Sequence, residues 1–157
     1  MRDIDATDLR LLALLQADAS VSNLQLAADA GTSPATALRR VRRLEAAGVI
    51  ERRIAVLSHD KLGVGLTALV EITLDRQGAE HLDAFERRAL AQAQVQQCYR
   101  VSPGPDFVLV VFAPDMAAYD ALVQRLFTQD ANVRNVKAFF SVRRAKFDPS
   151  IPLHGVR

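Results

Sequence analysis

Residues 31–48 of the 157-residue chain read GTSPATALRRVRRLEAAG, and this stretch decides the fold of the first third of the protein. Ser33 followed by Pro34 is typical of a helix start, with serine as the N-cap and proline as the first helical residue. Gly48 predicts the end of this helix, and Gly31 the end of the preceding one, which begins at Ser22. Two helices joined by so short a glycine-containing turn predict a helix-turn-helix motif.

A further helix is expected before this motif. Asp5 fits its N-cap, and Asp8 stands near the positive end of the helix dipole. Leu9, Leu11, Leu12 and Leu15 supply its apolar side.

Helical geometry separates two kinds of side chain on the third predicted helix. Successive residues of a helix are about 100° apart. With Arg39 at zero, the four arginines centre at about 20°, whereas Leu38, Val41 and Leu44 centre at about 200°. The aliphatic stripe is therefore predicted to pack on the first two helices, and the arginine stripe to face outward. No acidic residue interleaves on that face to form ion pairs one turn apart.

Such a helix fits the major groove of DNA, where its N-terminal residues approach the base edges. The alternative is a merely solvated charged face, but the position of the stripe, directly after the tight turn, favours DNA. Arg52 and Arg53 follow on a β-branched stretch that forms either a small wing or a connecting strand. The predicted DNA-binding residues are Thr32, Ser33, Ala35, Thr36, Arg39, Arg40, Arg42, Arg43, Arg52 and Arg53.

The distribution of charge agrees with this interpretation. The formal net charge is only +2. Residues 1–31 carry a net −3, residues 32–53 a net +4 and the remainder +1. The footprint expected for a polyanion is therefore local to the third helix and the stretch after it.

Residues 66–147 predict a different architecture. Strands are expected over 66–74, 95–101, 107–113 and 133–143, and helices over 78–94 and 115–129. The two halves match at an offset of 40, where Leu69-Val70 meets Leu109-Val110 and Leu82 meets Leu122. This is the ferredoxin-like βαββαβ pattern, so the predicted class is α+β.

The pattern leaves one face of the predicted sheet without a helix. Both helices cover the same face, yet residues 107–113 (FVLVVFA) are apolar on both sides. The uncovered side is either that of Phe107, Leu109 and Val111 or that of Val108, Val110 and Phe112. An uncovered apolar face usually means a partner, which predicts a homodimer formed through the sheets.

The composition excludes several other classes. A single cysteine excludes a disulfide framework and a multi-cysteine zinc site, and His59, His81 and His154 share no ligand spacing, so no metal is expected. The first 30 residues lack the apolar core of a signal peptide, and no apolar run approaches the length of a membrane helix. The expectation is a cytoplasmic protein of three parts: a DNA-binding domain over 1–50, a connection over 51–65 and a second domain over 66–157.

Taken together, these motifs resemble the Lrp/AsnC (leucine-responsive, feast-or-famine) family of transcriptional regulators over nearly the whole chain. The residues that carry the resemblance are Ile4-Asp5, Asp8, Leu11-Leu12, Leu26-Ala27, Thr32-Ser33-Pro34, Arg40-Val41-Arg42-Arg43-Leu44-Glu45, Gly48-Val49-Ile50, Leu62-Gly63, Gly104-Pro105-Asp106, Phe107-Val108-Leu109 and Lys146. The resemblance implies a winged helix-turn-helix that binds operator DNA, followed by a RAM-type ferredoxin-like domain. It further implies dimers that assemble into octamers.

The resemblance also implies a small effector, usually an amino acid, bound between the second domains of adjacent dimers. The effector loop of the family maps onto Gly104 and Asp106, and Ser102, Phe139 and Ser141 are further candidates on neighbouring strands. The sequence departs from the commonest pattern because Pro103 and Pro105 flank the glycine, which stiffens the turn and removes two N–H donors.

Two other functions remain open from the sequence alone. Some proteins similar to this family are siroheme decarboxylases, but the histidines here form no cluster, and no catalytic residue or cofactor is assigned. The other alternative is a ligand-binding module whose helix-turn-helix mediates only protein contacts.

Overall fold

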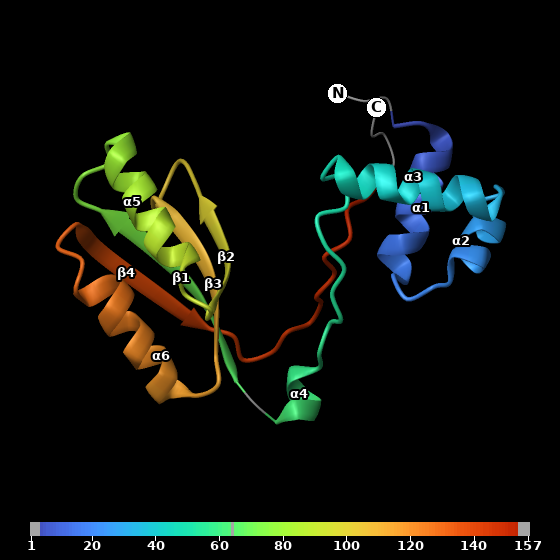
Figure 1. Ribbon diagram of the computed structural model, residues 1–157. Coiled ribbons are helices and arrows are strands. Elements are labelled where there is room, and N and C mark those ends of the chain that lie inside the picture. The colour runs from blue at the N-terminus through green and yellow to red at the C-terminus, as the bar shows by residue number, and fades with distance from the viewer. Residues whose placement is uncertain (1–3, 64, 154–157) are drawn as a thin grey trace. The chain divides into compact units, whose positions relative to one another are not determined.

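The computed structural model describes residues 4–63 and 65–153, which form two compact units (Figure 1). One unit contains the residues up to Val56 together with those from Lys146 on, and the other contains Leu57–Ala145. The first boundary falls within the predicted connection. The second boundary follows Ala145, and the backbone of Ile151 exchanges hydrogen bonds of 2.7 and 3.1 Å with the side-chain amide of Gln16.

The N-terminal unit is built from the three predicted helices, α1 (Ala6–Ala17), α2 (Asn23–Asp29) and α3 (Pro34–Ala46). Asp5 caps α1 as predicted, accepting hydrogen bonds from the backbone N–H groups of Thr7 and Asp8. The core contains Leu11, Leu26, Ala27, Ala30, Ala37 and Val41. Residues 51–58 have no regular secondary structure, so the stretch after α3 forms an irregular connector rather than a strand.

The second unit has the predicted order of strands and helices. After the short helix α4 (His59–Leu62) come β1 (Leu66–Leu74), α5 (Ala79–Leu90), β2 (Val95–Arg100), β3 (Phe107–Ala113), α6 (Met116–Val123), a π-helical turn over Gln124–Thr128, and β4 (Val133–Phe140). The four strands are antiparallel in the order β2-β3-β1-β4, which confirms the ferredoxin-like topology. The last strand ends three residues before the predicted boundary at residue 143.

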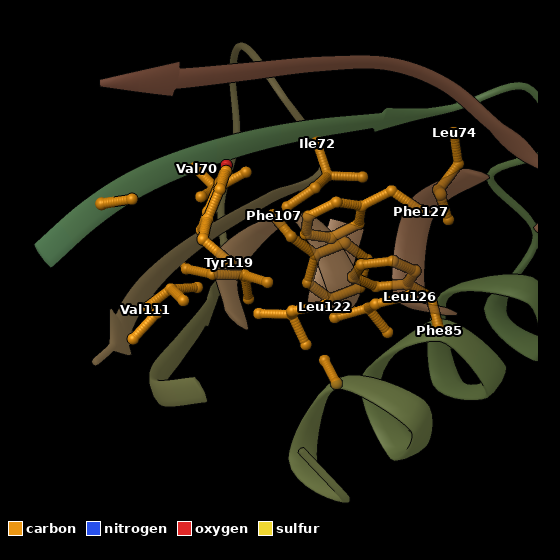
Figure 2. Packing of buried hydrophobic residues seen from close by; sticks show 14 residues of the cluster. Val70, Ile72, Leu74, Phe85, Phe107, Val111, Tyr119, Leu122, Leu126 and Phe127 are labelled. Carbon is orange, nitrogen blue, oxygen red and sulfur yellow. The ribbon is translucent and has the colours of Figure 1, made fainter. Parts of the chain in front are cut away.

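One face of the sheet packs against both long helices. Figure 2 shows Val70, Ile72 and Leu74 of β1 pointing toward Phe85 of α5 and Leu122 of α6. Along β3, the side chains of Phe107, Leu109, Val111 and Ala113 are buried on this side, which resolves the alternative left open by the sequence.

The opposite side of the sheet, here called the open face, carries Leu69, Val108, Val110, Phe112 and Phe139, which the strand register places on one side. Leu69 is 44% exposed, which explains why it interrupts the apolar alternation of its strand. The ring of His59 lies 4.3 Å from that of Phe112 and covers one end of the face. Of the remaining apolar side chains, Leu69 and Phe139 are exposed, and Val108 and Val110 are partly exposed.

Two kinds of feature are absent from the described residues. No helix among residues 4–63 and 65–153 is long and apolar enough to cross a membrane. Within the same ranges, no group of three or more His, Cys, Asp or Glu side chains is arranged to hold a metal ion. His154 lies outside the described residues.

Candidate functional site

The turn between α2 and α3 has the predicted helix-turn-helix geometry. Gly31 has a φ of +67°, the left-handed conformation that glycine adopts without strain. Ser33 caps α3 by accepting a hydrogen bond from the backbone N–H of Thr36. The side-chain amide of Asn23 donates to the Pro34 carbonyl at 2.9 Å, so the starts of the two helices are tied together. The N-terminus of α3 is thus presented at the surface.

The exposed surface of α3 differs from the predicted one. Arg39 and Arg42 are exposed, as predicted. Leu38 is 40% exposed, which corrects its assignment to the packed stripe. The buried arc is formed by Ala37, Val41 and Leu44 instead. The exposed residues Ala35, Leu38, Arg39 and Arg42 follow the spacing i, i+3, i+4, i+7 and form one row, here called the outer stripe.

Arg40 and Arg43 do not belong to the outer stripe, and the prediction that all four arginines face outward is wrong. Arg40 Nη1 lies 2.6 Å from Asp5 Oδ2 and 3.0 Å from Asp8 Oδ1, and Arg43 Nη2 lies 2.5 Å from Asp8 Oδ2. Their side chains are only 20% and 36% exposed. We call these four residues the acid–arginine cluster. It joins the start of α1 to the middle of α3.

Asp8 is the centre of this cluster. Its side chain is 0% exposed, and it is the one charged residue in the buried part of the described chain. It also accepts a hydrogen bond from the backbone N–H of Asp5 at 3.2 Å, completing a capping box. A buried carboxylate is stable only when it is paired and hydrogen-bonded, so Asp8 and its two arginines hold each other in place.

Asp5 closes the outer side of the cluster. Hydrogen bonds from the Asp8 backbone N–H and from the Arg40 side chain lower the pKa of the Asp5 carboxyl from 3.8 to about 2. Asp5 therefore remains ionised, and paired with Arg40, at pH values well above its pKa of about 2. The same pairing raises the pKa of Arg40.

The other predicted DNA-binding residues lie at the surface or near it. Thr32 and Thr36 are partly exposed, and Ser33, Ala35 and Arg52 are exposed. Arg53 donates to Glu45 Oε1 at 2.8 Å, an exposed ion pair that leaves both side chains in contact with water. Glu45, which lies one turn after Arg42 on the exposed side of α3, is thus paired with a cation of the connector.

The predicted effector loop borders an open pocket in the second unit. The pocket has a volume of about 430 Å³ and is lined by Gln77, Leu82, Arg100, Val101, Ser102 and Asp106. It brings together two of the predicted effector residues, Ser102 and Asp106. Gly104 is in the adjoining turn with a φ of +125° and does not line the pocket. Phe139 and Ser141 lie on and just after β4, at the other edge of the sheet from β2.

The charged groups of this effector pocket already have protein partners. Arg100 Nη2 donates to Asp83 Oδ1 at 2.7 Å and to Glu86 Oε2 at 2.8 Å. Asp106 Oδ2 accepts from the Leu74 backbone N–H at 2.7 Å and from Gln77 Nε2 at 3.2 Å. Asp106 is therefore more than a turn residue, because it anchors the end of β1. No residue in the described part of the chain donates to its other oxygen, Oδ1.

Comparisons with known proteins identify both domains of the chain. The family model described as winged helix-turn-helix DNA-binding matches residues 4–51, and the model described as Lrp/AsnC ligand binding domain matches residues 67–151. The chain belongs to the Lrp/AsnC family. As a member of this family, with relatives that are transcriptional regulators, it is a transcriptional regulator and not an enzyme.

Similar proteins extend over nearly the full chain. The leucine-responsive regulatory protein of Rhizobium meliloti is 35% identical over 92% of both chains. The Bkd operon transcriptional regulator of Pseudomonas aeruginosa is 31% identical over 98% of this chain and 100% of its own length.

Two solved structures have the same fold. The AsnC family transcriptional regulator of Agrobacterium tumefaciens has a TM-score of 0.86 at 32% identity, covering 95% of this chain and 97% of its own. A transcriptional regulator from Neisseria meningitidis in complex with L-Met has a TM-score of 0.86 at 26% identity, covering 97% and 98%. The Lrp/AsnC chain described here therefore shares its two-part architecture with experimentally determined regulators.

Proposed function

We propose that this Lrp/AsnC regulator binds specific operator DNA in the cytoplasm as a homodimer and that an amino acid modulates its assembly. The observation that carries the DNA contact is the outer stripe, in which Arg39 and Arg42 are exposed, while Glu45, one turn after Arg42, is paired with Arg53. Thr32, Ser33, Thr36 and Arg52 lie close to it in the sequence and supply further hydrogen-bond donors for phosphates. Arg40 and Arg43 act instead through the acid–arginine cluster, which fixes α3 on α1.

The proposed effector is an α-amino acid in the effector pocket. Asp106 Oδ1 is suited to accept from the ammonium group, the Ser102 hydroxyl to donate to the carboxylate, and Leu82 with Val101 to contact an aliphatic side chain. The L-Met complex of the Neisseria meningitidis relative supports this class of ligand. A ligand changes assembly only if it binds one assembly state more tightly than another. We therefore propose that the amino acid acts on the contacts between dimers, including those that would form an octamer.

An amino acid that binds this pocket is expected to raise the melting temperature of the protein. At about 100 times its dissociation constant, a ligand that binds only the folded state stabilises it by about 2.7 kcal/mol. A panel of the twenty L-amino acids, measured by thermal unfolding and by light scattering, tests both binding and assembly. Ser102→Ala should weaken the response, whereas the matched variant Ser20→Ala, an exposed serine of the N-terminal unit, should not. If no amino acid shifts the melting temperature, the proposed effector is contradicted.

The open face is the surface we propose for the dimer. Leu69→Lys places a charge in its centre and is expected to give a monomer at micromolar concentration, because burying an unpaired ammonium is costly. Leu90→Lys is the control, since Leu90 is an exposed leucine of α5, a helix on the covered side of the sheet. Sedimentation equilibrium measures both masses. A dimeric Leu69→Lys protein would show that the subunits associate elsewhere.

A further inference from the structure

Leu38 is an exposed apolar side chain beside the two exposed arginines of the outer stripe. It lies on the outer stripe between Ala35, one turn before it, and Arg42, one turn after it, and Arg39 is its neighbour in the sequence. The four side chains span an arc of about 100° on the helix. Any partner that covers the two arginines therefore also covers Leu38.

The N-terminal unit does not need Leu38 for its core. The buried cluster consists of Leu11, Leu26, Ala27, Ala30, Ala37 and Val41, with Leu14, Leu15, Val21 and Ile50 packed against it, and Leu38 is not among them. The part of the Leu38 side chain that stays in contact with water contributes no hydrophobic stabilisation to the unit. Its position is explained if the surface is covered by a partner that offers both anions and an apolar group.

The major groove of DNA offers both. Its edges carry the phosphates that Arg39 and Arg42 can reach, and its floor presents one apolar group, the C5-methyl of thymine. An apolar protein surface is a poorer fit, because it would bury two guanidinium groups without a partner. Glu45, an acidic residue near the stripe, is already paired with Arg53. The charge of the row thus favours DNA as the occupant.

We propose that Leu38 reads thymine by contacting its C5-methyl group and so determines one position of the operator half-site. Ala35, one turn nearer the N-terminus, is small enough to let the helix approach the base edges. This inference rests on the proposed binding of specific DNA through α3. It assigns sequence selectivity to a leucine, while Arg39 and Arg42, which follow it on the helix, supply affinity for the phosphates.

The test combines a protein variant with a base change that removes only the methyl group. A duplex is first selected from a randomised pool by the full-length protein, and each thymine in it is then replaced singly by deoxyuridine. At the contacted position, the wild-type protein is expected to bind the uracil duplex about fourfold more weakly, as for the removal of one buried methyl group. Leu38→Ala should bind the thymine and uracil duplexes equally.

Leu24→Ala is the matched control, because Leu24 is a leucine of the same unit that is 71% exposed and lies on α2. It should retain the fourfold preference for thymine. Leu38→Gln replaces Leu38→Ala if the alanine variant does not fold, and it too should lose the preference. Melting temperatures establish that each variant is folded before its binding is compared.

The outcomes separate the inference from the function on which it rests. If the pool yields no enriched sequence, the proposed binding of specific DNA fails. If a sequence is enriched but no thymine is sensitive to uracil, or if Leu38→Ala keeps the wild-type preference, only the role of Leu38 is overturned. If Leu38→Ala weakens binding to the thymine and uracil duplexes by the same factor, the preference for thymine is unchanged. That outcome also overturns the role of Leu38, because it indicates a general structural effect.

Discussion

Asp8→Ala is expected to destabilise the N-terminal unit by about 3 kcal/mol or more. Removing one partner of a buried ion pair costs about 3–5 kcal/mol because the opposite charge is left without compensation. Here two guanidinium groups lose their common carboxylate, and the capping interaction with the Asp5 backbone disappears as well. Arg43 is 36% exposed and can turn toward water, which places the expected value near the lower end.

This destabilisation is comparable with the whole stability of a small domain, so DNA binding should disappear through unfolding of the unit. Denaturant unfolding, with amide hydrogen exchange to follow each unit, measures the effect. The sheet of the second unit should remain protected, since it has its own buried core. Asp8→Asn keeps the shape and an acceptor oxygen, and it should fall between the wild type and the alanine variant.

Glu45→Ala is the matched control for an ion pair at the surface. It removes the exposed partner of Arg53 and should cost about 0.2–1 kcal/mol, the usual range for such pairs. If Asp8→Ala and Glu45→Ala unfold at the same denaturant concentration, the acid–arginine cluster does not hold α3 in place.

The acid–arginine cluster also shows where sequence patterns stop being informative. The starts of α1, α2 and α3 were predicted correctly because N-caps act within a few residues, whereas the helix predicted over 78–94 ends at Leu90. The partners of Arg40 are 32 and 35 positions away on another helix, and the angular positions within one helix contain no information about them. Asp8 was noted only for its place near the helix dipole, although the same carboxylate neutralises two arginines.

Leu38 illustrates a different limit. Its calculated angle is about 260°, some 60° from the centre of the aliphatic stripe, so its position at the edge was visible in the sequence. Leu44 lies equally far from the centre on the other side and is buried, so the angle alone does not distinguish the two. In the sheet, Leu69 interrupts the apolar alternation of residues 66–74, and the structure places Leu69 on the open face.

The effector loop was located by resemblance, and the pocket beside it could not be derived from the sequence. Its lining joins α5, the end of β2 and the turn after β2, which come together only in the folded sheet. The hydrogen bond from the Leu74 backbone to Asp106 links residues 32 positions apart. Local patterns gave no sign of this anchoring role.

Replacing Arg39 and Arg42 together with alanine is expected to weaken DNA binding on the order of 100-fold or more. Hydrogen bonds to charged groups contribute about 1.5–3 kcal/mol each, and the variant removes those of both side chains of the outer stripe. The logarithm of the binding constant should also fall less steeply with the logarithm of salt concentration, by about 0.9 for each phosphate that the variant no longer neutralises. The full-length protein and a selected duplex, titrated at several salt concentrations, give both quantities.

Arg87→Ala with Arg134→Ala is the control of equal charge, since both residues are exposed in the second unit. It should leave the salt dependence unchanged. Arg40→Ala with Arg43→Ala should instead lower the stability of the N-terminal unit, because it leaves the buried Asp8 without a cation. The two pairs of arginines alternate along α3 and have the same residue type, so the sequence of the helix does not distinguish their roles. The contacts of Arg40 and Arg43 with Asp5 and Asp8 do. If the Arg39 and Arg42 variant keeps the wild-type salt slope, the outer stripe does not contact phosphate.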